Sequence, residues 1–133
     1  MDAACPTAPD SASVVVDGNR LSLITEGPDR LAALLGLIDG AKRSLRLLYY
    51  IYRGDRSGGQ VRDALDRALD RGVDVGLLVD GFGFAARDQY FDALVAKGMR
   101  FCRFHPTLGR RYLIRNHQKL ALAHGDSPRV GPP

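Results

Sequence analysis

A chain of 133 residues with 45% apolar residues can bury one hydrophobic core, so we expect a single globular domain. Its two cysteines, Cys5 and Cys102, follow no metal-ligand or redox spacing, which argues against a disulfide framework and favours a reducing compartment. No segment has the length and hydropathy of a membrane span or a secretory signal. We expect a cytoplasmic protein, with peripheral contact to the anionic inner face of a membrane left open.

The expected elements begin after a flexible leader over residues 1–12, which is rich in Ala, Pro, Ser and Asp. Ordered structure is expected over 13–125, and residues 126–133 have the composition of a loop-like tail. Two short apolar runs, 14–16 and 21–24, enclose an Asp-Gly turn, which is typical of a β-hairpin.

Helical and strand patterns alternate through the rest of the chain. Parallel strands linked by helical crossovers produce such alternation. We therefore expect an α/β fold, a layered α-β-α domain with a mixed, mostly parallel sheet, in which the first long strand is buried on both faces. The expected elements are a helix from Pro28 to about Gly40, a strand over 45–52, a helix over 59–71, a strand over 73–79, a helix over 87–97, and strands over 99–104 and 118–123.

Positive charge is concentrated late in the chain. All three histidines and no carboxylate fall within residues 93–125. Because the whole chain carries a net charge of +4, the remainder sums to −3. A local cationic field of this kind suits an anionic substrate or a nucleic-acid backbone. Seven basic residues contribute to it: Lys97, Arg100, Arg103, Arg110, Arg111, Arg115 and Lys119.

Within that segment, His117 and Lys119 stand at alternate positions of an expected strand, so their side chains would share a face. An imidazole can attack phosphorus and carry the transferred group covalently, while a neighbouring ammonium offsets charge on the phosphoryl oxygens. The surrounding cations favour the neutral imidazole by lowering its pKa. The pair therefore indicates phosphate chemistry.

The sequence Arg-Asn-His-Gln-Lys over 115–119 precedes an apolar strand and Gly125. Together with the preceding strand-helix units and the phrase Gly-Val-Asp-Val-Gly-Leu-Leu-Val-Asp-Gly-Phe-Gly over 72–83, it resembles the amino-terminal half of bacterial cardiolipin synthase-like proteins of the phospholipase D superfamily. The likeness spans about residues 21–125.

The resemblance implies a His-x-Lys-x4-Asp motif whose first two members are His117 and Lys119. It also implies phosphodiester cleavage or transfer on a phospholipid through a phosphohistidine, without a metal or other cofactor. His117 would be the nucleophile or general acid. Lys119, with Asn116 and Arg115, would bind the substrate phosphate.

Two departures from the family pattern bear on activity. The motif position that carries Asp in the family is His124, which cannot replace a carboxylate as an acceptor and, if protonated, would repel Lys119. The family also needs two facing motifs, whereas one is present, so the second would come from a missing half or from a homodimer. We expect a truncated amino-terminal half. Activity of this chain alone stays open. The alternatives are a dimeric nuclease-like protein acting on nucleic acid, which is less favoured, and a non-catalytic remnant.

Weaker interpretations concern a glycine-rich motif, one acid and the histidines. Gly81-Phe-Gly-Phe-Ala-Ala86 fits a dinucleotide fingerprint placed between a strand and a helix, but Arg103 stands where an acid is wanted. Asp80, before it, is a candidate acid lining the site. His105 is interpreted as a loop or surface histidine. The three histidines together match no common zinc spacing.

Overall fold

The computed structural model describes residues 13–105 and 119–125, and its contacts divide the chain into units 1–33 and 34–133. In the first unit, β1 (Ser13–Val16) and β2 (Asn19–Ser22) form an antiparallel hairpin. Asp17 and Gly18 both have positive φ, as a tight hairpin turn between right-handed twisted strands requires. The predicted hairpin is confirmed, although its second strand begins two residues earlier than expected.

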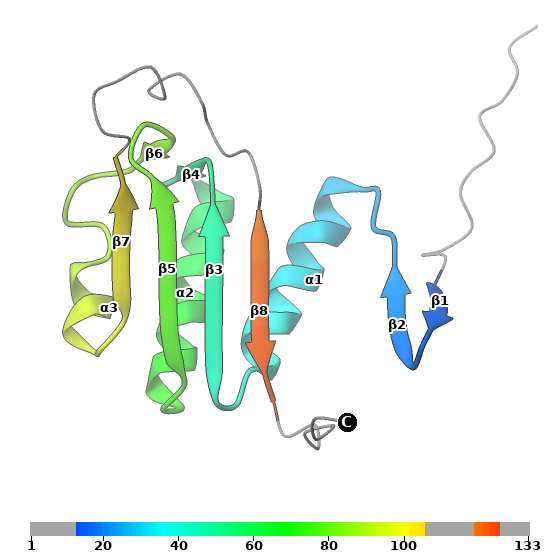
Figure 1. The fold of residues 1–133 in the computed structure, drawn as a ribbon. Coiled ribbons are helices and arrows are strands. Elements are labelled where there is room, and N and C mark those ends of the chain that lie inside the picture. The colour runs from blue at the N-terminus through cyan, green and yellow to red at the C-terminus, as the bar shows by residue number, and fades with distance from the viewer. Residues whose placement is uncertain (1–12, 106–118, 126–133) are drawn as a thin grey trace, which may run out of the picture. The chain divides into compact units, whose positions relative to one another are not determined.

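In the second unit, four strands form one sheet in the order β7-β5-β3-β8 (Figure 1). β3 (Ser44–Tyr49), β5 (Asp74–Asp80) and β7 (Arg100–Phe104) are parallel, and β8 (Leu120–His124) is antiparallel to β3. The expected mixed, mostly parallel sheet of an α/β layered fold is confirmed. Because β8 runs in the opposite direction, its first residue lies at the edge of the sheet where the other three strands end.

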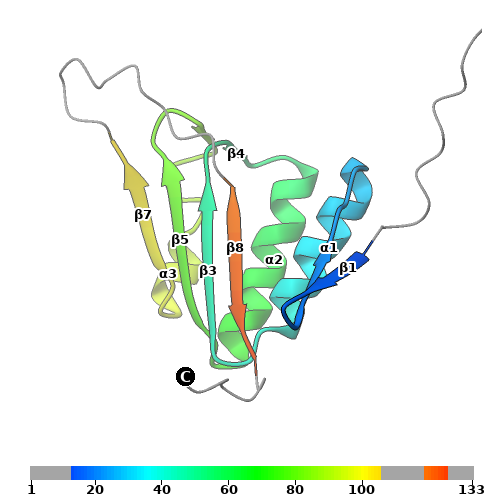
Figure 2. The same cartoon turned by 45° about the vertical axis from the view of Figure 1, so that its right-hand side comes forward.

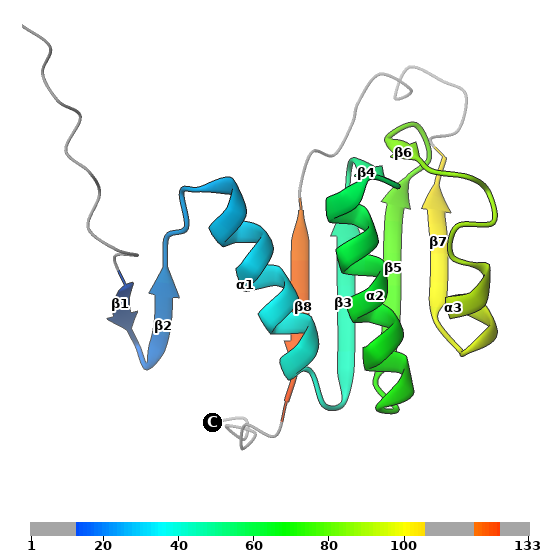
Figure 3. The ribbon, with the colours of Figure 1, turned by 180° about the vertical axis from the view of Figure 1, so that it is seen from behind.

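Helices α2 (Arg56–Asp70) and α3 (Asp92–Ala96) lie on the same face of this sheet, as Figures 2 and 3 show from two directions. α1 (Gly27–Gly40) has nearly the predicted bounds, and its buried residue is Ile38. The division between the two units falls within this helix. The core of the second unit consists of alternate sheet residues packed with apolar residues of α2; its fully or nearly fully buried members include Leu45, Leu47, Val61, Leu65, Ala68, Val75, Leu77 and Val79.

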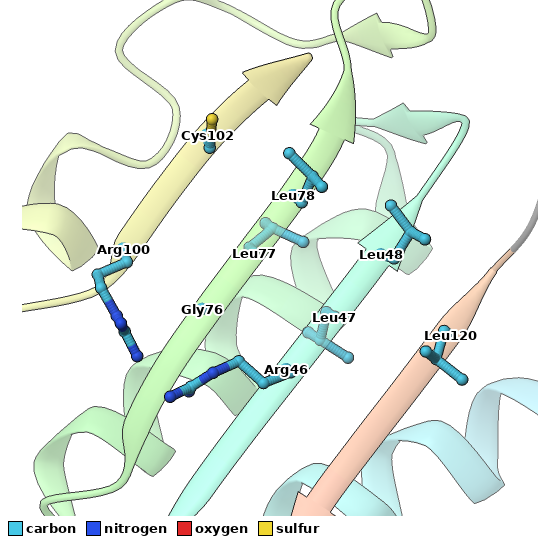
Figure 4. Close-up of a pocket in the computed structure, with 9 residues that line it drawn as sticks. All are labelled: Arg46, Leu47, Leu48, Gly76, Leu77, Leu78, Arg100, Cys102 and Leu120. Carbon is cyan, nitrogen blue, oxygen red and sulfur yellow. The ribbon is translucent and has the colours of Figure 1, made fainter. Parts of the chain in front are cut away.

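The opposite face of the sheet is open in the part of the chain that the structure describes (Figure 4). Leu78, Leu120 and Leu122 are 38%, 49% and 56% exposed on it. The expectation that residues 45–52 form a strand buried on both faces was therefore wrong: β3 alternates between buried and half-buried residues and ends at Tyr49. Apolar residues of β3 also lie on the uncovered face of the sheet. The continuous apolar run in the sequence therefore suggested burial on both faces.

Two helices differ from their predicted bounds. α2 begins at Arg56, three residues earlier than expected, because the carboxylate of Asp55 accepts a hydrogen bond from the Gly58 backbone N at 2.9 Å. α3 covers only 92–96, whereas 87–97 was expected. Residues 87–91 form turns instead, and these place the ring of Phe91 among Tyr52, Phe84 and Phe101.

Two short strands extend the loops that follow β3 and β5. β4 (Tyr52–Arg53) and β6 (Phe84–Ala85) pair in parallel, with Tyr52 opposite Phe84. Figure 1 shows this pair beyond the carboxyl ends of the sheet strands. Open α/β sheets place their ligand crevices at this edge.

Candidate functional site

Lys119 lies at the carboxyl edge of the sheet. Leu48 of β3 is opposite Leu120 of β8, so the next residues in this register are Tyr49 and Lys119. Lys119 is exposed and forms no ion pair with another described residue. Tyr49, beside it, is half-buried, and burial raises the pKa of its hydroxyl. The ammonium of Lys119 therefore stands at this edge without a carboxylate partner in ranges 13–105 and 119–125.

The other predicted members of the motif, Arg115, Asn116 and His117, lie outside the described residues. The shared face of His117 and Lys119 therefore stays a prediction. In β8, Ala121 and Ala123 are half-buried whereas the residues between them are exposed. By strand alternation, Lys119 belongs with these two alanines, on the side opposite the open apolar face.

His124, at the altered motif position, lies at the far end of β8. It is opposite Ser44, and its carbonyl accepts hydrogen bonds from the backbone N of Lys42 and of Arg43. It lies five positions along the strand from Lys119, which corresponds to about 16 Å. The expected repulsion between a protonated His124 and Lys119 was therefore wrong. The two residues lie at opposite edges of the sheet.

Asp80 is at the carboxyl edge, as expected for an acid lining a site. It is 8% exposed, and its Oδ1 accepts hydrogen bonds from the backbone N of Phe82 at 2.8 Å and of Gly83 at 3.4 Å. A carboxylate that binds the next two amides stabilises a turn. These contacts give Asp80 a structural role in the loop after β5.

The two glycines of this loop lie against other residues closely. A side chain at Gly83 would collide with the carbonyl of Tyr50, and one at Gly81 would collide with the imidazole of His105. The residues that follow form β6, and the next helix begins only at Asp92. The dinucleotide interpretation requires a helix N-terminus at the glycine turn. Its absence from this part of the described chain excludes that interpretation.

His105 follows β7 and lies at the same edge as Lys119, as an exposed residue against Gly81. It was predicted as a surface histidine, and its exposure confirms this. Three steps between strands separate β7 from β8, or roughly 14 Å. His105 is therefore not a contact of Lys119. His105 and His124 occupy opposite edges, so the three histidines cannot bind one metal ion.

Several of the cations counted in the sequence are paired. The Nζ of Lys97 lies 2.7 Å from Asp66 and 2.9 Å from Asp70, and these hydrogen bonds, Asp66 first, raise the pKa of Lys97. Arg100 pairs with Asp74 at 2.8 Å and Arg103 with Asp88 at 3.0 Å. The acids come from earlier segments of the chain. The free positive charge near the site is thus smaller than the sequence count, and Arg110 and Arg111 lie outside the described residues.

A hollow of about 490 Å³ lies on the open face of the sheet, below the carboxyl edge (Figure 4). Its apolar lining includes Leu48, Leu78 and Leu120, and Arg46 and Arg100 stand at one end. Both arginines donate hydrogen bonds to Asp74. The hollow therefore offers apolar contact but little free charge.

A second hollow, of about 530 Å³, lies among the loops that carry β4 and β6. Sequence reasoning missed it, because its lining comes from two segments about thirty residues apart that the β4–β6 pairing brings together. Its lining residues are Gly54, Ala85, Ala86, Arg87 and Tyr90.

No described helix has the length and apolar character needed to cross a bilayer. No group of three or more His, Cys, Asp or Glu side chains is arranged to hold a metal ion in the described ranges 13–105 and 119–125.

Comparison with known proteins identifies relatives along most of the chain, although no family model matches it. The major cardiolipin synthase ClsA of Bacillus subtilis is 36% identical over 124 residues, which is 90% of this chain and 26% of that protein. Cardiolipin synthase 1 of Bacillus anthracis is 31% identical over 115 residues, 83% of this chain and 23% of its own. A cardiolipin synthase of Listeria monocytogenes is 27% identical over 127 residues, which is 92% of this chain and 26% of that protein.

These matches confirm the resemblance predicted from the residues around Lys119. The chain spans about a quarter of the length of the curated relatives that it matches.

Proposed function

We propose that this chain takes part in phosphatidyl transfer on a phospholipid, because bacterial cardiolipin synthases of the phospholipase D superfamily are its homologues. At the level of the family, the homology supports transfer between phospholipid phosphodiesters. The single observation that supports a role for this segment is the position of Lys119. Lys119, which has no ion-pair partner among the described residues, stands at the edge where three parallel strands end, two positions after the predicted nucleophile His117.

In the proposed reaction, a ring nitrogen of His117 attacks the phosphorus of the donor lipid. A P–N bond forms, the P–O bond to the headgroup alcohol breaks, and that alcohol leaves with a proton from a general acid. A hydroxyl of the acceptor then loses its proton to the same group and attacks phosphorus, which restores the free imidazole. Water as the acceptor gives hydrolysis, and a lipid alcohol gives transfer.

Lys119 would stabilise the charge on the non-bridging phosphoryl oxygens, together with Asn116 and Arg115. A neutral His117 is needed for attack, and nearby cations favour that form. The general acid would be the histidine of a second motif, which the family resemblance implies. We propose that this motif comes from polypeptide beyond this segment or from a second copy of the chain.

Lipid phosphodiesters are favoured over nucleic acid by the ion pairs around Arg100 and Arg103. A nucleic-acid backbone is held chiefly by unpaired cations, and affinity grows with the number of phosphates neutralised. Three of the seven basic residues counted in the sequence already bind carboxylates. The nuclease-like alternative therefore has fewer cations available than the sequence suggested.

The test is to incubate the chain with phosphatidylglycerol, quench the mixture in denaturant, and search for a phosphatidyl adduct by mass spectrometry. We expect an adduct on His117 that disappears in His117→Ala. Lys119→Met should slow its formation by about 10²–10³-fold, because one charge-stabilising group is lost.

The matched control is His105→Ala, which removes a histidine from the same edge of the sheet. It should leave the adduct unchanged. A folded wild-type chain that forms no adduct on His117, or an adduct that survives in His117→Ala, would overturn the covalent route for this chain.

A further inference from the structure

The hollow around Gly54 lies near the carboxyl edge, and the described residues that line it do not include Lys119. Its framework is main chain: Arg53 is opposite Ala85 in the β4–β6 pair, and the Gly54 backbone N donates to the Ala85 carbonyl at 3.2 Å. The lining at this position is therefore held in place by hydrogen bonds between two loops.

Small residues keep this hollow open. Gly54, Ala85 and Ala86 contribute at most a methyl group each to its lining. A Cβ at position 54 would lie 3.2 Å from the Tyr90 ring and 3.4 Å from the Ala86 methyl group, closer than most real contacts. Larger side chains at these positions would therefore fill the space.

Arginine side chains lie at the hollow and close to it in the sequence. Arg87 lines it, and Arg53 and Arg56 flank Gly54 closely in the sequence. All three are exposed, and none forms an ion pair with another described residue. Arginines that lack a carboxylate partner are free to bind another anion.

The acids nearest in sequence each bind a group other than these three arginines. Asp55 caps α2 through its hydrogen bond with the Gly58 backbone N, and Asp88 pairs with Arg103. A fourth arginine adds to the local field: the guanidinium of Arg62 stacks 4.9 Å from the ring centre of Tyr90, a residue that lines the hollow. Its buried Nε has no hydrogen-bond partner among the described residues.

We infer that this hollow is an anion subsite that binds a phosphate group, of the chemistry shared by phospholipid headgroups and free phosphate. Arg87 would contact the phosphate oxygens through its planar guanidinium. The backbone framework and the small residues would provide the space for it. None of the five lining residues has a part in the proposed transfer reaction, so binding at this subsite is measured independently of that reaction.

The experiment follows backbone amide signals of the full chain by nuclear magnetic resonance during titration with inorganic phosphate. Saturable shifts are expected at Gly54, Ala85, Ala86 and Tyr90. Arg87→Gln should weaken this binding by about ten-fold, as expected for loss of a charge-assisted hydrogen bond. Arg87→Lys, which keeps the charge but loses the planar fork, should retain part of it.

The matched control is Arg67→Gln, which removes an exposed arginine of α2 that is paired with Asp39. It changes net charge by the same amount and should leave the affinity unchanged. Equal losses in Arg67→Gln and Arg87→Gln, or shifts scattered over the surface without saturation, would show nonspecific attraction and overturn the subsite. Absence of any shift would do the same.

A second arm identifies the source of the phosphate. The chain is sedimented with phosphatidylcholine vesicles, with and without phosphatidylglycerol. Binding that needs phosphatidylglycerol, competes with phosphate and falls in Arg87→Gln assigns the subsite to a lipid headgroup. Phosphate binding without an Arg87-dependent vesicle contribution assigns it to a free phosphate. The adduct on His117 is measured separately, so failure of the catalytic proposal remains distinguishable.

Discussion

At the scale of single residues, Asp74 joins two arginines from neighbouring strands. Its carboxylate accepts hydrogen bonds from Arg46 of β3 and Arg100 of β7. The hydrogen bond from Arg46 first, and then the nearby charges, lower the pKa of Asp74 below its ordinary value of 3.8. The group is exposed, so its contribution to stability is small and sensitive to salt.

This lowered pKa predicts a specific dependence on pH. The stabilisation is present above the unfolded-state pKa and is lost as the pH falls through the lower folded-state value. Asp74→Asn should therefore be less stable than wild type at pH 7, and the difference should shrink below pH 3.8. Urea unfolding at a series of pH values measures it. A difference that grows as the pH falls would contradict the assignment.

Gly81 supports a second residue-scale prediction. Any side chain there would collide with the imidazole of His105. Gly81→Ala should therefore shift the His105 ring signals and increase the exposure of that ring, as measured by nuclear magnetic resonance and by the rate of modification with diethyl pyrocarbonate. Gly59→Ala, where a Cβ has open space, is the control. An unchanged His105 in Gly81→Ala would refute the packing argument.

At the scale of elements, the start of α2 depends on one capping side chain. Asp55 accepts a hydrogen bond from the Gly58 backbone N, and Tyr52 anchors the same turn by donating its hydroxyl to the Gly58 carbonyl at 2.6 Å. Gly58 cannot be replaced there, because a Cβ would collide with the Arg53 carbonyl. The first turn of α2 and the loop with the arginine-flanked hollow are thus built from the same residues.

Removal of this cap should destabilise the protein. Asp55→Ala is expected to lower the free energy of unfolding by about 1 kcal/mol, because a helix N-terminal amide loses its acceptor. Asp63→Ala, an exposed acid within the same helix, is the control and should be neutral. Chemical denaturation of both variants provides the comparison. Equal effects in the two would mean that Asp55 contributes charge alone.

The elements also show how far the sequence could be interpreted. The Asp-Gly hairpin, the alternating strands and helices, and the glycine that ends α2 carry local signals, and all were predictable. The start of α2 was placed three residues too late, at Gly59, because the apolar periodicity begins only at Val61 and the capping role of Asp55 was not recognised. The predicted α3 was too long, because the tertiary packing of Phe91 overrides the local helical periodicity.

The site was predictable in part for the same reason. The placement of Lys119 at a strand start follows from local pattern, but the direction of β8 does not, and that direction sends His124 to the opposite edge. The partners of Lys97, Arg100 and Arg103 come from 15 to 31 residues away in sequence. Charge counted within one segment could not reveal them.

At the scale of the whole sheet, one face is covered by helices and the other presents leucines to solvent in the described ranges. Parallel sheets are normally covered on both faces, and contiguous exposed apolar surface promotes association. The chain studied by itself should therefore associate with increasing concentration.

Leu122→Lys tests this expectation. Leu122 is 56% exposed on β8, so a lysine there should lower both self-association and binding of a hydrophobic dye without loss of fold. Val95→Lys is the control, since Val95 is 45% exposed on α3, away from the open face. Sedimentation velocity over a range of concentrations measures the change. Equal effects of the two substitutions would indicate a general benefit of charge.

The position of β8 has a further consequence. This strand is the last in the order of the described sheet and is hydrogen-bonded to β3 alone, whereas β3 and β5 each have two neighbours. A strand at the edge of a sheet separates from its neighbour at a lower free energy than a central strand does. We therefore expect β8 to detach from β3 while the remaining strands stay folded. Displacement of Lys119 and global unfolding would then be separate events with separate thermal midpoints.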